Sequence, residues 1–321
     1  VQQHVPNSNA DQAPNDSVKT TPTGGLERSA TRAAKSHITF RAPRHRFTLL
    51  DHIEGLEKLL QEAHRRFTAQ TQLSLSHAGE WLLDNFYVVQ QALRQIREDL
   101  PEEFYRQLPK VQIGPPQNCP PRIYLVAREI IRYSQNYLVA EQVQRFVRTY
   151  QGIAHLTMGE LWALPTMLRL GILEKLAQAV VHITGLEAPE SAQWFTVAAT
   201  APQELEDERI VPNCILSLRW LGVQDWKAFF ESISRVELIL RRDPANIYAK
   251  MDFDTRDRYR KVIEELALAT AWDEEDVAQE AIRAAEASTS DLPRTRHVGY
   301  YLLGAGRAQL EARLGYHPPA R

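Results

Sequence analysis

Apolar residues recur along this 321-residue chain at the spacing of amphipathic helices, from about Leu49 almost to the C-terminus. The clearest stripe lies in 76–98, where apolar residues step by four, three, four and three positions: Leu82, Phe86, Val89, Leu93 and Ile96. Residues at that spacing share one face of a helix, and the face must pack against a core. Alternation typical of strands is scarce. The pattern therefore predicts an all-α fold of antiparallel and kinked helices.

The same periodicity, with the residues that punctuate it, predicts further helices. Their expected ranges are 102–108, 122–134, 139–150, 158–183, 225–241, 255–270, 274–287 and 297–314. Thr157, with Glu160 three residues later, forms a capping-box sequence ahead of 158–183, and Pro165 is expected to kink that helix. Gly304 and Gly306 are expected to loosen or break the last helix.

The start of the chain differs in composition from the helical part. Residues 1–40 are rich in Asn, Gln, Ser, Thr, Pro and Gly, so we predict a disordered tail followed by a helical domain over 41–321. The Pro- and Gly-containing run 109–121 is expected to be a loop and is a candidate subdomain boundary. The chain begins at Val1 rather than at Met, which indicates a piece of a longer protein.

Composition and charge exclude several classes of function. The 38 Lys and Arg residues nearly balance the 40 Asp and Glu residues, so no overall field attracts nucleic acid. The most apolar segment, 161–176, is interrupted by Arg169, Glu174 and Lys175, so no transmembrane span is predicted and this piece alone is expected to be soluble. Two cysteines and scattered histidines lack metal-ligand spacing and predict no metal site.

The sharpest short motif is the D-x-D formed by Asp252, Phe253 and Asp254. Many sugar-nucleotide transferases hold a divalent metal with such a pair of carboxylates, since hard cations prefer oxygen ligands. Here Asp254 immediately precedes a predicted helix, and capping of that helix is the favoured interpretation. Asp252 and Asp254 are therefore kept only as weak metal candidates.

The predicted helix 255–270 carries four basic residues, Arg256, Arg258, Arg260 and Lys261. One interpretation of this basic run is a functional one, a face of the helix that binds phosphate. However, Glu264 and Glu265 follow Arg260 and Lys261 at i,i+4 spacing, as on an ordinary solvated helix. We therefore expect a solvated face.

Polar and aromatic residues also gather within two turns of the helix 76–98: Trp81, Asp84, Asn85 and Tyr87, beside Glu80. Such a set can stack on a sugar ring and hydrogen-bond to it, but aromatic residues readily bury their rings in helical cores. Core packing is favoured, with sugar contacts as the alternative, and core positions are also expected for Trp220, Trp226, Phe229 and Phe230. No nucleophile elbow, Walker loop or dinucleotide motif is present, so no catalytic or cofactor-binding residue is assigned.

Longer blocks of sequence resemble the N-terminal region of cyclic β-1,2-glucan synthases and occur in the same order. They span about Leu49 to Arg313, and the first forty or so residues are not covered. The blocks are EWLLDNFY (80–87), IREDLP (96–101), FYRQLP (104–109), RFVRTYQ (145–151), LTMGELWALPTMLR (156–169), YAKMDFDTRDRYR (248–260) and HVGYYLL (297–303).

The resemblance implies that this chain is one helical part of a much longer enzyme. In such synthases a membrane-embedded glucosyltransferase domain, which uses UDP-glucose and a divalent metal, follows the helical region, and a phosphorylase-like domain comes last. These domains would be the partners of this chain, glucan would be a further ligand, and the cytoplasmic face of the inner membrane would be its location. The transferase's catalytic carboxylates lie in the part that this chain lacks.

Two functions from different classes follow from these expectations. The first is a non-catalytic helical scaffold of a glucan synthase, and the alternative is a free-standing helical module that binds a protein or a glucan. A third hypothesis is that the chain is itself a transferase. It requires a set of preorganised catalytic residues, which the sequence does not show.

Overall fold

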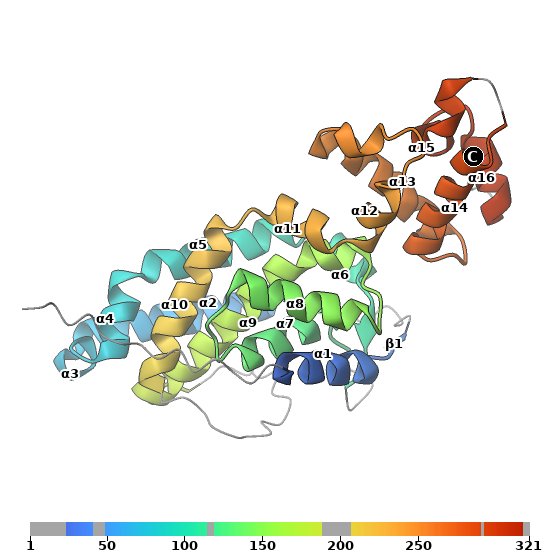
Figure 1. Cartoon of the computed structure of the whole chain (residues 1–321). Helices are drawn as coiled ribbons and strands as arrows, with labels where there is room; N and C mark the ends of the chain where they lie inside the picture. The colour runs from blue at the N-terminus through green and yellow to red at the C-terminus, as the bar shows by residue number, and fades with distance from the viewer. Residues whose placement is uncertain (1–23, 41–48, 114–118, 188–206, 290–291, 317–321) are drawn as a thin grey trace, which may run out of the picture.

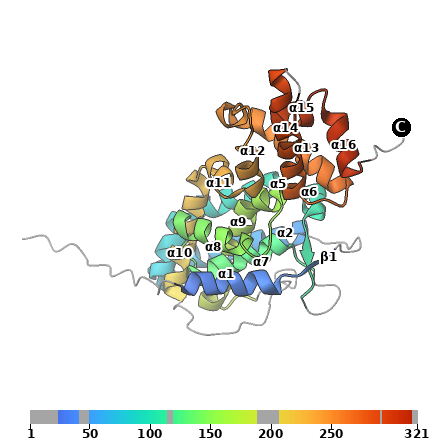
Figure 2. The ribbon, with the colours of Figure 1, turned by 45° about the vertical axis from the view of Figure 1, so that its right-hand side comes forward.

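The structure is a computed structural model that describes residues 24–40, 49–113, 119–187, 207–289 and 292–316. Among these residues the fold is helical, as predicted, and one short antiparallel strand pair accompanies the helices. The ribbon divides into two parts, which we call the helical body (25–233) and the C-terminal lobe (235–314) (Figure 1). Both views place the lobe at one end of the body (Figure 2).

The helical body comprises α1 (Gly25–Ser36), β1 (Thr39–Phe40), α2 (Leu49–Ala69), α3 (Thr71–Ser74), α4 (His77–Asp84), α5 (Phe86–Asp99), α6 (Glu102–Gln107), β2 (Lys110–Val111), α7 (Arg122–Tyr133), α8 (Ala140–Gln151), α9 (Met158–Thr184), α10 (Asp207–Val223) and α11 (Trp226–Ile233). The C-terminal lobe comprises α12 (Arg235–Leu240), η2 (Tyr248–Lys250), α13 (Phe253–Ala269), α14 (Glu274–Glu286), η3 (Pro293–Arg296), α15 (Val298–Leu302) and α16 (Arg307–Leu314). Within the described residues no helix is both long enough and apolar enough to cross a membrane.

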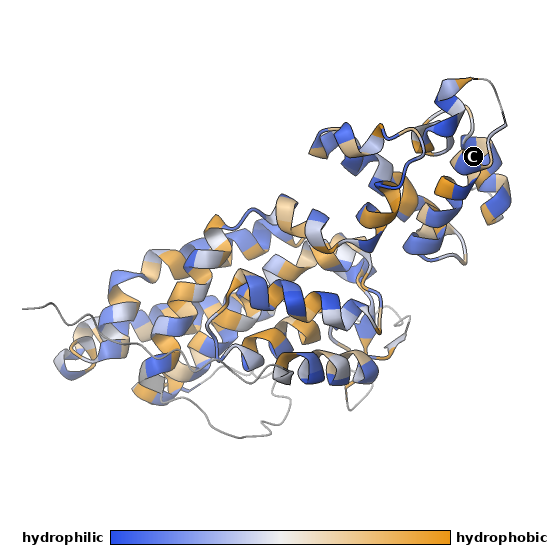
Figure 3. Ribbon diagram, viewed as in Figure 1, coloured by the Kyte–Doolittle hydropathy of each residue, from blue (hydrophilic) through white to orange (hydrophobic). Residues whose placement is uncertain are grey.

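Helix α9 is the central element of the helical body. Its side chains are buried around most of its circumference, and it packs against α2, α5, α7 and α10. A helix that is apolar on all sides has to be enclosed by others, whereas its neighbours need only one apolar stripe. Figure 3 shows this difference, because most of the surrounding helices carry a hydrophobic and a hydrophilic side. The body is therefore a shell of amphipathic helices around α9.

The predicted capping box at the start of α9 is confirmed. Thr157 Oγ1 accepts a hydrogen bond from Glu160 N at 3.2 Å, and Glu160 Oε2 accepts one from Thr157 N at 2.9 Å. Glu160 is fully buried, and its other oxygen accepts from Arg122 Nε at 2.8 Å. Pro165 lies inside the helix, and the kink expected there stays a prediction.

The predicted disorder of the first forty residues is wrong from residue 24 onward, and residues 1–23 lie outside the described part of the chain. Helix α1 packs against α7 and α8 through its buried residues Leu26, Ala30, Ala33 and Ala34. These residues lie on one helical face, and their small side chains allow the helices to approach closely. The low average hydrophobicity of the segment hid this stripe.

Two helices that we predicted as continuous are broken by a polar residue. Asn85 separates α4 from α5, and its Nδ2 donates to Trp81 O at 2.8 Å. Ser234 separates α11 from α12, and its Oγ accepts from Glu237 N at 3.2 Å. The sequence Ser-Arg-Val-Glu at 234–237 is the signature of a helix start, although the apolar periodicity continues across it.

The remaining elements include one helix that was not predicted, one confirmed break and one strand pair. Helix α10 was not predicted at all, although it packs against both α9 and α4. The break between α15 and α16, which contains Gly304 and Gly306, is confirmed. In the loop 109–121, β2 pairs with β1 through Thr39 and Val111, and the proposed subdomain boundary there stays a prediction.

Replacing Thr157 by alanine is expected to lower the free energy of unfolding by about 1 kcal/mol, the typical value of a lost N-cap. Thr157→Ser keeps the hydroxyl acceptor and serves as the matched control. Urea denaturation followed by circular dichroism measures both variants. An alanine variant as stable as the serine variant would contradict the role of the capping box.

Candidate functional site

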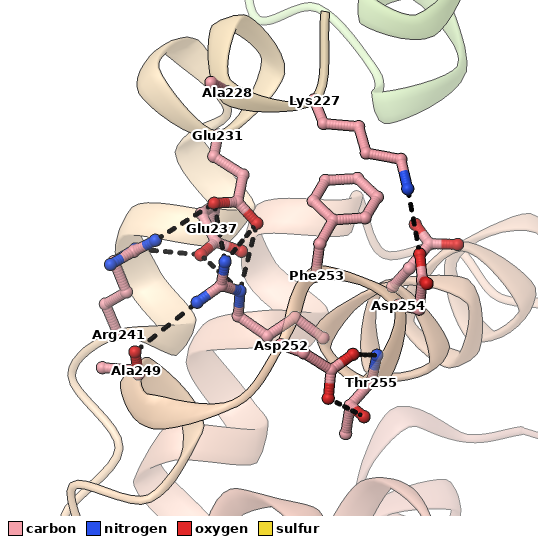
Figure 4. Close-up of polar contacts among 12 residues, drawn as sticks. Lys227, Ala228, Glu231, Glu237, Arg241, Ala249, Asp252, Phe253, Asp254 and Thr255 are labelled. Atoms are coloured by element: carbon pink, nitrogen blue, oxygen red, sulfur yellow. Dashed lines mark hydrogen bonds and ion pairs between the residues drawn. The ribbon is translucent and has the colours of Figure 1, made fainter. Parts of the chain in front are cut away.

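The two carboxylates of the D-x-D motif serve different structural purposes (Figure 4). Asp252 caps α13, because its side chain accepts from Thr255 N at 2.9 Å and from Thr255 Oγ1 at 2.7 Å. The prediction that Asp254 is the cap is wrong, since Asp254 already lies in the first turn, is 84% exposed and accepts from Lys227 Nζ at 3.2 Å. Within the described ranges, no group of three or more His, Cys, Asp or Glu side chains could hold a metal ion.

The basic run of α13 is not a solvated face, so this prediction is wrong for its buried members. The side chains of Arg256 and Arg260 are 11% and 2% exposed, whereas Arg258 and Lys261 point to solvent. Lys261 Nζ bonds to Asp257 at 2.9 Å and not to the expected glutamate one turn later. The reason lies outside the helix, because α11 and α12 present carboxylates to the buried side of α13.

These carboxylates and the buried arginines form what we call the arginine–glutamate network: Glu231, Glu237, Arg241, Arg256 and Arg260. Arg260 Nη1 donates to Glu237 Oε2 at 2.8 Å, and Arg256 Nη2 donates to both oxygens of Glu231 at 2.7 Å. Arg241 Nε donates to Glu237 Oε1 at 2.9 Å. Figure 4 shows the dashed contacts converging between the two glutamates. The network joins α11, α12 and α13.

Glu237 is the centre of this network and is fully buried. Tyr248 donates a further hydrogen bond to it, at 2.7 Å between Tyr248 Oη and Glu237 Oε2. Burial, and then the charge of Glu237, raise the pKa of Tyr248, so the phenol stays a donor. Burial alone would lower the pKa of Arg260, but its neighbours Tyr248 and Glu237 outweigh this and raise it. A buried carboxylate is tolerated only with such compensation.

Beside the network, a cleft of about 360 Å³ opens between α9, α11 and α13. We call it the α13 cleft, and it is the candidate functional site. Its floor contains Arg260 from the network, and its walls combine aromatic rings with charged groups. The lining residues are Met158, Trp162, Lys227, Phe253, Asp254, Asp257, Arg260, Lys261 and Glu264.

The aromatic wall of the α13 cleft is held rigidly. Trp162 stacks on Phe230 with ring centroids 4.3 Å apart and meets Phe253 edge to face at 5.9 Å. The guanidinium carbon of Arg260 lies 4.6 Å from the centre of the Phe253 ring, and Lys227 Nζ lies 4.7 Å from it. Figure 4 shows Phe253 between Lys227 and the network. Cation–π contacts of this kind fix the ring as well as the charges.

The sequence singles out several residues of the α13 cleft but does not predict that they lie together. In the sequence, Phe253 is only the middle residue of the D-x-D, and Trp162 is only one position of the block 156–169 that resembles the glucan synthases. The signal that could have found the cleft is the spacing of Phe253, Asp257, Lys261 and Glu264, which places them on one face of α13. The contribution of α9 could not be read from that spacing.

The other predicted set is divided by the structure. Asn85 is buried at the break between α4 and α5 and also accepts a hydrogen bond from Arg219. Trp81 is half-buried against the core, whereas Asp84 is exposed and Tyr87 is 58% exposed. Tyr87 Oη approaches Arg219 Nη2 at 3.5 Å. Asn85 thus has a structural task, and sugar contacts at Trp81, Asp84 and Tyr87 stay a prediction.

A second buried polar cluster ties the far side of the C-terminal lobe together. Asp243 accepts from His297 Nδ1 at 2.8 Å and from the backbone N–H of Val298 at 2.8 Å, and Tyr259 Oη lies 3.1 Å from His297 Nε2. Burial alone would raise the pKa of Asp243, but these hydrogen bonds outweigh it and lower the pKa to about 2. A side chain at Gly299 would meet Tyr259 Oη at 2.5 Å, so the cluster also requires glycine there.

The chain is similar to a curated protein of known product. No family model matches it. It is 28% identical, over an alignment of 334 residues, to the cyclic beta-(1,2)-glucan synthase NdvB of Rhizobium meliloti (strain 1021). The alignment covers 82% of this chain but 12% of that synthase. The similarity agrees with the resemblance found in the sequence blocks.

Replacing Arg260 by methionine is expected to lower the free energy of unfolding by about 3–5 kcal/mol, because Glu237 would lose its buried counter-charge. Lys261→Met, on the same helix but 72% exposed, is the matched control and should change it by less than about 1 kcal/mol. Urea denaturation compares the two. Equal losses would show that the network does not stabilise the lobe.

The stability of the fold is also expected to depend on Glu274, at the junction of α14 and α9. Burial raises the pKa of Glu274 to about 8, against the hydrogen bond that its carboxylate accepts from Met158 N at 2.7 Å. The nearby carboxylates Glu264 and Glu160 raise it further. The folded state therefore keeps a proton that the unfolded chain releases near the ordinary pKa of a glutamate, 4.5.

It follows that the free energy of unfolding should fall as pH rises from about 4.5 to about 8. Glu274→Gln keeps a hydrogen-bond acceptor but cannot ionise, so it should flatten this slope. Urea denaturation at several pH values within that window measures the slope, and exposed Glu286→Gln is the control, with the wild-type slope expected. A Glu274→Gln variant with the wild-type slope would contradict the assignment.

Proposed function

We propose that this chain is a non-catalytic helical scaffold within a glucosyltransferase similar to cyclic β-1,2-glucan synthase. The observation that carries the proposal is the similarity to the Rhizobium meliloti synthase over 82% of this chain, which spans only 12% of that protein. Glucan synthesis from UDP-glucose, with a divalent metal, would be carried out by domains outside this chain. Those transferase and phosphorylase-like domains would be its partners.

The arrangement of polar groups supports a scaffold. Asp252 and Asp254, the pair that matched a transferase motif, are engaged in a helix cap and a surface ion pair. The buried ionic groups of the C-terminal lobe bind one another across α11, α12 and α13, where they hold helices in place. Groups paired with one another in this way are suited to fix geometry, whereas a catalytic constellation needs free groups aimed at a reacting atom.

Position within the synthase forms the second part of the proposal. The chain would lie at the cytoplasmic face of the inner membrane, beside the membrane-embedded transferase domain, as in the enzymes that it resembles. The C-terminal lobe, at one end of the body, would face the domains that follow it in the sequence (Figure 1). The scaffold would then hold the lobe at a fixed angle to the transferase.

The alternative is a free-standing helical module that binds a protein or a glucan without catalysis. The α13 cleft favours this alternative, because a cleft of this kind can bind a ligand without a transferase domain. A third possibility, catalysis by the chain itself, would show as turnover of UDP-glucose by the isolated protein. The experiment below separates the three.

The decisive experiment replaces the matching segment of the Rhizobium meliloti synthase with residues 24–316 of this chain. We expect membranes with the chimera to incorporate labelled glucose from UDP-glucose into cyclic glucan, and membranes with the segment deleted to lose this activity. Immunoblots of both membranes control for expression.

Full synthesis by the deleted enzyme would overturn the scaffold proposal. An inactive chimera beside an active wild-type enzyme would favour the free-standing module. Release of UDP from UDP-glucose by the isolated chain, with magnesium present, would instead identify a transferase.

A further inference from the structure

We infer that the α13 cleft is a binding site for a short segment of a neutral glucan chain. The inference rests on the proposed function only for the type of glucan, because the cleft by itself indicates a neutral hexose oligomer. Two features of the cleft carry it: its aromatic wall and its balanced charges.

The aromatic wall suits the apolar face of a sugar ring. Trp162 and Phe253 both line the cleft, and their rings are perpendicular, with an interplanar angle of 90°. Because Phe230 stacks on Trp162, and Arg260 and Lys227 lie against Phe253, neither ring can turn freely. Rigid aromatic rings offer a large contact area at little cost in conformational entropy. A ligand with C–H-rich faces would be bound without reorganisation of the wall.

The charged groups of the cleft favour a neutral ligand. Three carboxylates, on Asp254, Asp257 and Glu264, accompany three cationic groups, on Lys227, Lys261 and Arg260. Carboxylates accept hydrogen bonds, and ammonium and guanidinium groups donate them, whereas a sugar hydroxyl does both. Because these six charges cancel, the cleft has no net charge that would attract a phosphate or a nucleoside diphosphate.

Arg260 is the most deeply buried charged residue that lines the cleft. Its side chain is 2% exposed, it lines the cleft, and its Nε is a buried donor without a hydrogen-bond partner in the described part of the chain. Its other nitrogens are engaged, Nη1 with Glu237 at 2.8 Å and Nη2 with Asp257 at 3.4 Å. Because this nitrogen has almost no exposed surface, Arg260 positions the aromatic wall, and the ligand would bond to the exposed groups at the rim.

The size of the cleft limits the length of chain that it can hold. Its volume of about 360 Å³ lies near the lower end of the range for small-molecule sites. It therefore fits a short segment of glucan, and a longer chain would extend past the rim formed by the exposed residues Asp254 and Lys261. The carboxylate and amine at this rim would bond to the hydroxyls of the adjoining sugar.

The test is titration of the isolated chain with short linear β-1,2-linked gluco-oligosaccharides, by calorimetry and by saturation-transfer NMR. We expect saturable binding by the wild-type protein. Trp162→Ala should weaken it about tenfold, the effect of one lost aromatic contact, and Trp162→Phe should restore most of it. Circular dichroism checks that each variant is folded.

Asp254→Ala tests the site without risk to the fold, because this side chain is 84% exposed. We expect it to weaken binding severalfold. Asp84→Ala is the matched control, since Asp84 is also an exposed aspartate on a helix, in the rival set of α4 and α5. Its affinity should equal that of the wild type.

The outcomes separate this inference from the proposed function. Three outcomes would each overturn the inference. The first is that no gluco-oligosaccharide binds, and the second is that Asp84→Ala loses binding while the cleft variants keep it. The third is that UDP binds the cleft more tightly than the oligosaccharides do. If the cleft binds both β-1,2- and β-1,4-linked oligosaccharides, the glucan site is supported. Only its specificity for the β-1,2 linkage, which rests on the proposed function, would be given up. An inactive chimera with intact cleft-dependent binding would refute the scaffold and leave the glucan site standing.

Discussion

The ion pair between Glu237 and Arg260 is the constraint on which the C-terminal lobe depends. A fully buried carboxylate must be compensated by opposite charge and hydrogen bonds, or it would ionise at great cost. Glu237 obtains this compensation from α12 itself, through Arg241 close by, and from α13 through Arg260. The same glutamate therefore ties α13 to α12, and Arg260, which it binds, also lines the α13 cleft.

The helical body reaches the same site through α9. The capping box at Thr157 fixes the start of α9, and its buried Glu160 is held by Arg122 of α7. One turn from the cap, Trp162 projects into the α13 cleft and stacks on Phe230 of α11. Body and lobe thus meet where both are most strongly ordered by buried ionic groups.

Local sequence chemistry predicted some elements because their causes are local. The capping box of α9 and the break near Gly304 depend on residues within a few positions, and both were found where expected. Asn85 and Ser234 broke two predicted helices, since apolar periodicity continues across a polar residue that bonds to its own backbone. Helix α1 was missed because its apolar stripe consists mainly of small alanines in a segment of low average hydrophobicity.

The sequence by itself determined the helical class, most helix ranges and the resemblance to a glucan synthase, because periodicity, caps and long blocks are properties of contiguous residues. Only the tertiary structure decided which charges are buried. Arg260 and Lys261 are neighbours in sequence with nearly the same chemistry, yet one is enclosed beside Glu237 and the other is in solvent. The partners that distinguish them come from other helices. The packing of these helices decides which charges are buried, and it brings residues that are distant in the sequence together in the α13 cleft.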